Sequence, residues 1–316
     1  MQPPLLTLPN ELLLTILSTF HTHDILPLTL ISHRLHALVL RILHTRLLLA
    51  ANLHEHTLLL ECYHPSARLT EPPLYCTYLG TAGLDVGAGA SKQWDESKCA
   101  IGQLGKMKNL YSSFRPHRRL PDGPRPRHPA GDIPGSRTHV SSAAASSSTA
   151  ARFDGVTVKQ TLSLESHELF TQLCADSNLV RVGPRNGLFT SFVQVEEGVV
   201  RVWRDWLAQM AGLEGETSID GFSQSEQVLV DDVGRNRHIL WVDTLKNVGI
   251  NVRVKERKWR RDTPILMEAN EDDAVSYDIE YEELLVRTST LMMKLEESLL
   301  HDDNHSGKAI VFGSFS

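Results

Sequence analysis

The chain has 316 residues, of which 41% are hydrophobic and 22% charged, so it holds enough apolar material for a packed core and is not wholly disordered. At roughly 150 residues per domain, this length favours about two domains. The 32 basic and 38 acidic side chains give a formal net charge of -6, which excludes a global positive field that would attract nucleic acid or a membrane surface.

The cysteines and the start of the sequence favour an intracellular location. No CxxC pair occurs among the four cysteines, which are Cys62, Cys76, Cys99 and Cys174. The first residues lack the sections of a secretory signal, and the leucine-rich residues 38–53 fall short of the roughly 20 apolar residues of a bilayer span. We therefore expect free thiols in a soluble protein of the cytoplasm or nucleus.

Residues 5–60 are rich in leucine and carry the spacing of amphipathic helices. Asn10 or a neighbouring residue can cap a first helix, whose apolar stripe is formed by Leu12, Leu13, Ile16, Leu17 and Phe20. Asp24 can cap a second helix with Pro27 in its first turn, where proline loses no hydrogen bond. Ser32 can cap a third helix, whose apolar residues are Leu35, Leu38, Val39, Ile42 and Leu43.

Three short helices in about forty residues bury too little surface to be stable alone. Each leucine or isoleucine gains about 1.5–3 kcal/mol on full burial, so a handful docked on another protein would offset the entropy cost of association. The composition of this segment therefore predicts a partner surface.

At residues 115–151 the composition changes to proline, glycine, arginine, serine and alanine. Prolines remove amide donors and favour extended backbone, and this stretch has nothing to form a core, so we expect a disordered linker. The glycine-rich residues 80–90 predict a second mobile segment.

Beyond the linker, apolar residues mostly recur at every second position, as in strands, and no longer at the three- and four-residue spacing of helices. Residues 166–176 predict one short helix on the spacing of Leu169, Phe170 and Leu173. The runs with strand-like alternation or β-rich composition are residues 188–195, 199–205, 238–244, 248–257 and 275–282.

The connections between these runs indicate antiparallel pairing. Glu196-Glu197-Gly198 and Lys246-Asn247 both favour a hairpin turn, so we expect a β sandwich or a curled sheet. Residues 288–300 fit either a last strand or a helix. Their leucines are four residues apart, as in a helix, and two glutamates interrupt the alternation that a strand would show.

Four short motifs follow one another near the start of the chain. They are Leu8-Pro9-Asn10-Glu11-Leu12-Leu13, Ile16-Leu17, Asp24-Ile25-Leu26 and Leu30-Ile31-Ser32-His33-Arg34-Leu35. In this order they resemble the F-box, over about residues 5–45. The remainder resembles the C-terminal region of F-box proteins from fungi, notably at residues 240–243 and 277–282, without indicating a substrate.

The resemblance implies an adaptor that docks on the Skp adaptor of a Skp, cullin and F-box ubiquitin ligase and presents a protein substrate. On the family pattern, the residues that contact the Skp adaptor or hold the three helices together are Leu8, Pro9, Leu12, Ile16, Leu26, Ile31 and Leu35. The sequence does not divide these two roles. Two residues depart from the family pattern: Leu35 stands where many F-boxes carry tryptophan, and His33 stands where a cation is frequent.

The motifs of the chain favour neither catalysis nor a bound cofactor or metal. Gly221-Phe222-Ser223-Gln224-Ser225 lacks the closing glycine of a nucleophile elbow, and residues 87–92 have neither dinucleotide nor phosphate-loop spacing. The pairs His21-x-His23 and His54-x-His56 lack zinc-finger spacing. We therefore expect a protein that is not an enzyme and that holds no cofactor or metal.

The sequence fixes no substrate-binding residue. Residues 253–261 are basic, but acidic residues follow, which favours a solvated strand edge and leaves the role of this run open. Tryptophans and arginines of the second half belong either to the core or to a recognition surface, and the first candidates for such a surface are Trp203, Trp206, Trp241, Trp259, Arg201, Arg204 and Arg257.

Together these patterns predict an α+β protein. We expect a three-helix F-box at residues 1–50, a partly ordered connecting region at 51–114, a disordered linker at 115–151 and an antiparallel β-rich, sandwich-like recognition domain at 152–316. The alternative function is a β module that binds a small molecule or glycan, with an F-box that assembles no ligase.

Overall fold

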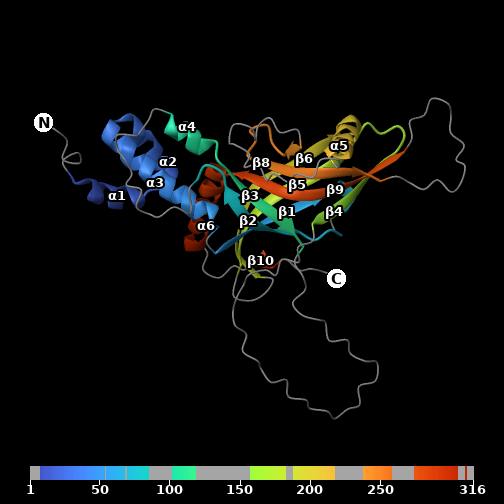
Figure 1. Ribbon diagram of the computed structural model, residues 1–316. Coiled ribbons are helices and arrows are strands. Elements are labelled where there is room, and N and C mark those ends of the chain that lie inside the picture. The colour runs from blue at the N-terminus through green and yellow to red at the C-terminus, as the bar shows by residue number, and fades with distance from the viewer. Residues whose placement is uncertain are drawn as a thin grey trace, which may run out of the picture.

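The computed structural model joins an N-terminal helical part to a curled antiparallel sheet that approaches a barrel (Figure 1). The described residues are 8–53, 55–67, 70–84, 102–118, 157–182, 188–217, 238–257, 274–304 and 310–311. Most of the expected linker, residues 119–151, lies outside them, as do residues 85–90 of the glycine-rich stretch and 258–261 of the basic run.

The helical part consists of α1 (Asn10–Ser18), the short α2 (Thr22–Ile25), the 3-10 helix η2 (Leu26–Leu30) and α3 (His33–Ala51). Ser32 caps α3 as predicted, because its hydroxyl accepts a hydrogen bond from the Leu35 amide at 3.2 Å. Pro9, a neighbour of Asn10, holds the cap position of α1, which lies within the prediction, although no side chain caps this helix. The predicted cap of the second helix is wrong, because His21 holds that position and Asp24 lies inside the first turn of α2.

All strand pairs of the sheet are antiparallel. The strands are β1 (His56–Tyr63), β2 (Leu74–Thr81), β3 (Tyr111–His117), β4 (Val158–Leu164), β5 (Phe170–Val182), β6 (Leu188–Trp203), β7 (Ile239–Trp241), β8 (Val248–Glu256), β9 (Val275–Arg287) and β10 (Ile310–Val311). Their order is β10-β6-β5-β1-β2-β3-β9-β8-β7, and β4 pairs with β9 off this path. The first half of β9 pairs with β4 and its last residues with β3, which lets the sheet curl.

The sheet begins much earlier than the expected boundary at residue 152. Strands β1, β2 and β3 come from residues 56–117 and pair in one sheet with strands from the second half of the chain. The remaining elements are η3 (Pro65–Ala67), α4 (Gln103–Lys108), α5 (Arg204–Thr217) and α6 (Thr288–Asn304). Residues 288–300, whose pattern fitted either a strand or a helix, are therefore helical.

Two predicted elements differ from the structure. Residues 170–176 belong to strand β5 and not to a helix, and the side chains of Thr171, Leu173 and Ala175 are buried in alternation. The hairpin expected at residues 196–198 is also wrong, since β6 continues through Gly198. A Cβ atom at Gly198 would lie 2.6 Å from Cγ1 of Val242, so this glycine permits a close approach instead of a turn. The hairpin between β7 and β8 is confirmed.

Apolar side chains from the strands, α5 and α6 fill the interior of the sheet. Among its fully buried members are Leu58, Leu60, Phe114, Leu173, Leu179 and Tyr281. Leu207 and Met210 of α5 and Leu291 of α6 join the same cluster. A second cluster combines the leucines of α1 and α3 with Met292 of α6, so α6 packs against both parts of the molecule.

Candidate protein-binding surface

Helix α1 carries two apolar stripes on different sides. Leu13 and Leu17 face inward and are 1% and 5% exposed, whereas Leu12 and Ile16 face outward and are 51% and 41% exposed. Both pairs are four residues apart, so each forms a row along the helix. Phe20, just beyond the end of α1, is also exposed. The described residues cover only one of the two stripes.

The end of the 3-10 helix η2 carries further exposed apolar side chains. Leu30 is 89% exposed and Ile31, which follows η2, is 63% exposed. We call Leu12, Ile16, Leu30 and Ile31 the apolar face of the helical part. Leu30 and Phe20 were not among the predicted contact residues, although both belong to the apolar pattern of the sequence.

The seven predicted contact residues do not share one environment. Pro9, Leu12, Ile16 and Ile31 are exposed, while Leu8 and Leu26 are half-buried. Leu35 is 2% exposed and packs in the cluster between α1 and α3. The geometry thus assigns Leu35 to the internal packing of the helices, a distinction that the sequence left open.

Arg34 fixes the start of the chain against α3. Its Nε donates a hydrogen bond to Oδ1 of Asn10 at 2.7 Å, and its Nη2 donates to the carbonyl oxygen of Leu8. Asn10 therefore serves as an acceptor for α3 rather than as the cap of α1. Because α1 is held at its first turn, its outer stripe keeps a defined direction.

A polar cluster joins the helical part to α6. Oε1 of Glu296 accepts hydrogen bonds from the Thr22 hydroxyl at 2.6 Å and from Nη1 of Arg46 at 3.0 Å. The Thr22 amide donates to the other carboxylate oxygen at 3.0 Å. The Arg46 and Glu296 side chains are only 16% and 20% exposed, so solvent screens their attraction weakly.

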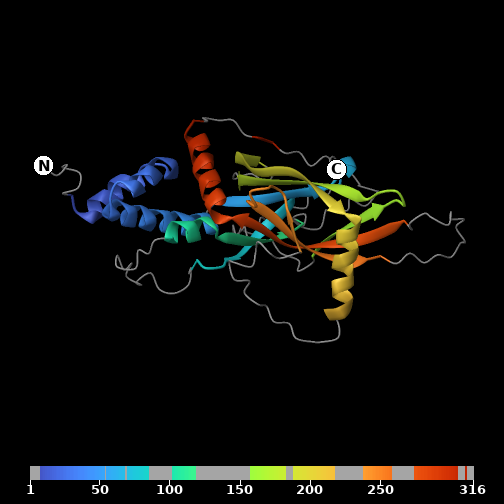
Figure 2. The ribbon, with the colours of Figure 1, turned by 90° about the horizontal axis from the view of Figure 1, so that it is seen from above.

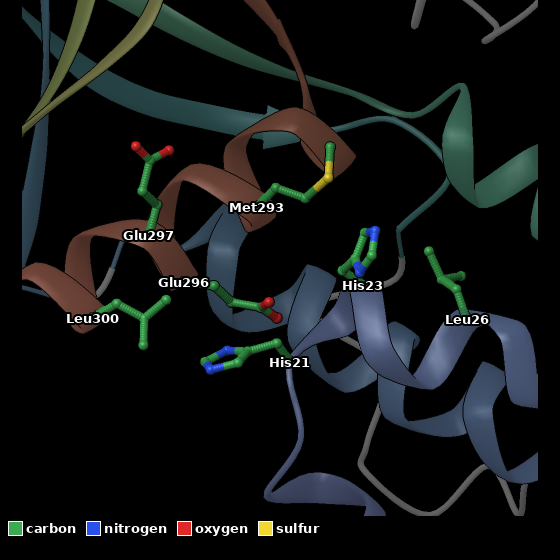
Figure 3. A pocket seen from close by; sticks show the side chains of 7 residues that line it. All are labelled: His21, His23, Leu26, Met293, Glu296, Glu297 and Leu300. Carbon is green, nitrogen blue, oxygen red and sulfur yellow. The ribbon is translucent and has the colours of Figure 1, made fainter.

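A pocket of about 230 Å³ opens beside this cluster, between α2 and α6 (Figure 3). Its lining consists of His21, His23, Leu26, Met293, Glu296, Glu297 and Leu300. The carboxylate of Glu296 is engaged by Thr22 and Arg46, as described above. The pocket thus marks the junction of the two parts of the molecule.

The candidate tryptophans of the second half separate into different environments. Trp203 at the end of β6 is 49% exposed, and its ring centroid lies 5.2 Å from that of Phe170. Trp206 packs against the interior cluster, and Trp241 contacts Tyr111 with a centroid distance of 5.7 Å. Trp259 lies outside the described residues.

Buried thiols and hydroxyls of the sheet contribute to packing. Desolvation raises the pKa of the Cys62 thiol to about 12 and also raises that of Cys76, which keeps both protonated and poorly nucleophilic. Nε2 of His56 lies 3.0 Å from the Ser298 hydroxyl, but both residues are buried, at 8% and 0% exposure. This pair stabilises the contact between β1 and α6.

Within the described ranges, no three histidine, cysteine, aspartate or glutamate side chains gather closely enough to hold a metal ion. His21 and His23 are both exposed. His54 and the motifs at residues 87–92 and 221–225 lie outside the described residues. Among the described helices, none has the length and apolar character needed to cross a membrane.

A comparison of the chain with protein-family models, with curated proteins and with solved structures finds no match.

Proposed function

We propose that this protein is a non-catalytic F-box adaptor of the cytoplasm or nucleus. Its helical part would dock on the Skp adaptor of a Skp, cullin and F-box ubiquitin ligase, and its sheet would present a protein substrate. The observation that carries the proposal is the outer stripe of α1, where Leu12 and Ile16 stay exposed while Leu13 and Leu17 are buried.

Burial of the apolar face would favour association. Full burial of a leucine or isoleucine side chain stabilises a complex by about 1.5–3 kcal/mol. The side chains of the apolar face, Leu12, Ile16, Leu30 and Ile31, are between 41% and 89% exposed. Even at the lower value, their burial would offset a substantial part of the entropy cost of association. Exposed apolar side chains that gather on one part of a molecule are typical of a protein-binding site.

Adaptor function needs no chemistry from this chain. Holding a substrate beside a ubiquitin-loaded partner raises the effective concentration of the reacting groups, and the partner performs the transfer. The polar cluster of Thr22, Arg46 and Glu296 supports this role, because it ties the helical part to α6 of the sheet. A fixed distance between two binding surfaces is what such an adaptor has to supply.

The packed interior of the sheet favours a substrate that binds outside. Phe114 and Tyr281 occupy the interior with 0% and 1% exposure, surrounded by buried leucines and valines. A small molecule or glycan inside the described strands would have to displace these side chains, whereas a protein substrate can bind on the outer surface.

The proposal is tested by co-purification of tagged full-length protein with the Skp adaptor and the cullin. Leu12→Asp combined with Ile16→Asp places two charges on the outer stripe and should abolish recovery of both ligase subunits. Leu245→Asp is the matched control, because Leu245 is 70% exposed in the turn between β7 and β8. Undiminished recovery with the double variant, whose folding is checked by circular dichroism, would reject the proposal.

A further inference from the structure

The β5–β6 ladder ends far from the apolar face. In both views, α5 and the adjoining ends of β5 and β6 lie at the opposite end of the sheet from α1 (Figures 1 and 2). The strand register pairs Phe170 with Trp203 and Cys174 with Val199 across these two strands. A surface at this end would face away from a partner bound to the helical part.

The outer face of this ladder carries exposed apolar side chains around one cation. Val199, Arg201 and Trp203 alternate with the buried Val200 and Val202, so all three point outward. Val199 is 56% exposed, Trp203 49%, and the preceding Leu169 66%. We call Leu169, Phe170, Val199, Arg201 and Trp203 the tryptophan patch.

The positive charge of the patch has no acidic partner among the described residues. The guanidinium carbon of Arg201 lies 5.4 Å from the centroid of the Phe170 ring, and no carboxylate of the described residues forms an ion pair with it. By contrast, Arg253 on β8 pairs with Glu282 at 2.6 Å. An arginine stacked on an aromatic ring keeps its donors free for a carboxylate.

Arg204 anchors the loop next to the patch. Nη1 of Arg204 donates to the carbonyl oxygen of Ser166 at 3.0 Å, and the Arg204 amide donates to that of Leu169 at 2.9 Å. The loop is thus tied to the start of α5. A preorganised aromatic and arginine surface loses little entropy on binding, and these residue types dominate binding energy at protein interfaces.

We propose that the tryptophan patch binds the protein substrate through a short segment that combines apolar side chains with a carboxylate. The carboxylate pairs with Arg201, and the apolar side chains cover Trp203 and Leu169. This inference rests on the proposed adaptor function, since it names the surface that receives the substrate of the same adaptor.

The charges near the patch favour an acidic and apolar protein segment over a nucleic acid. Arg201 is the one cation of the patch. The adjoining loop and α5 contribute the acidic side chains of Glu165, Glu168 and Asp205 together with Arg204, whose guanidinium is engaged by carbonyl oxygens of the loop. A phosphate backbone gains affinity from several cations and is repelled by these carboxylates. A peptide segment with a single carboxylate between apolar residues can pair with Arg201 and places no further negative charge next to the acidic side chains.

The experiment selects a random-peptide phage library on the purified full-length protein and measures the affinity of the enriched peptides by fluorescence anisotropy. Enriched peptides should carry aspartate or glutamate beside leucine or aromatic residues. Arg201→Glu and Trp203→Ala should each weaken their binding about tenfold or more. Lys106→Glu, an equal charge reversal at an exposed position of α4, should leave it unchanged.

A charge exchange separates recognition from a loss of folding. Replacing the peptide carboxylate by lysine should restore binding to the Arg201→Glu variant, which a merely misfolded surface would not do. Absence of enriched peptides, enrichment that survives Arg201→Glu, or tighter binding of a single-stranded oligonucleotide would overturn the inference. Because no ligase subunit is present, this result is independent of whether the Skp adaptor binds.

Discussion

The helical part and the sheet differ in how completely they bury their apolar side chains. In the sheet, strands, α5 and α6 enclose one interior cluster in which Phe114 and Tyr281 are almost completely buried. In the helical part, one stripe of α1 is buried and the neighbouring stripe is exposed, so Leu13 at 1% and Leu12 at 51% exposure stand side by side in the sequence. The interior cluster of the sheet is covered within the chain, whereas the described residues leave the outer stripe of α1 uncovered.

The face of the sheet around Glu280 also differs from the outer stripe of α1. On the outside of the sheet, Glu280 of β9 accepts from Nζ of Lys159 at 2.7 Å and from Nζ of Lys255 at 3.1 Å. These paired charges keep that face solvated. The outer stripe of α1 offers apolar side chains instead, which is typical of an interaction site. The contrast separates a face of paired charges from an exposed apolar stripe within one molecule.

The largest expected effect tests the completeness of the sheet. Phe114→Ala would remove a fully buried ring next to Tyr78, whose centroid is 5.6 Å away, and should lower the free energy of unfolding by about 3–5 kcal/mol. Chemical denaturation of the full chain measures this loss. A loss below about 1 kcal/mol, which is typical of a surface substitution, would mean that the interior is not packed as described.

The next effect compares two adjacent leucines of α1. Leu13→Ala should cost about 2–5 kcal/mol because the inner stripe is buried. Leu12→Ala should change the free energy of unfolding by no more than about 0.5 kcal/mol, since its side chain is half exposed. Equal losses in denaturation would show that both stripes are covered within the chain and would remove the distinction between the two regions.

A smaller effect concerns the junction between the regions. Glu296→Ala leaves Arg46 and Thr22 without their shared acceptor and should cost about 1.5–3 kcal/mol. Glu297→Ala is the matched control, because Glu297 is 46% exposed and pairs with Lys294 on the same helix. Hydrogen exchange should show faster opening of α2 and α3 in the Glu296 variant only. Unchanged exchange would contradict a polar link between the parts.

The smallest effect is a pH dependence from the charged face of the sheet. Hydrogen bonding from Lys159, and then from Lys255, holds the pKa of Glu280 below its usual 4.5 in spite of burial. Its contribution to stability is therefore present above pH 4.5 and is lost as the pH falls through the lower folded pKa. Glu280→Gln should flatten this acid limb of the stability profile. An unchanged limb would show that the two lysines do not stabilise the carboxylate.

The sequence predicted the elements whose signal is local. Ser32 predicts the start of α3, because its side chain can cap only the turn that follows. Lys246 and Asn247 predict the β7–β8 hairpin, in which Lys246 adopts a left-handed backbone with φ 57°. The alternation of residues 275–282 likewise predicts β9. In each case, one short stretch contains the whole physical cause.

Elements decided by distant residues were missed or left open. The spacing of Leu169, Phe170 and Leu173 fits one helical turn, yet pairing with β6 makes this stretch a strand. The close approach of Val242 explains Gly198, and no local pattern contains that contact. Arg46 and Glu296 are 250 positions apart, so the junction of the two regions follows only from the fold. The same holds for which stripe of α1 is exposed.

The most direct test of the central claim is a calorimetric titration of the purified Skp adaptor into the full-length protein. We predict saturable binding with a negative heat-capacity change, the signature of apolar burial, and its loss in the Leu12→Asp and Ile16→Asp double variant. Absence of binding by the unaltered protein, or an equal affinity of the folded double variant, would contradict the claim that the apolar face of the helical part is completed by this partner.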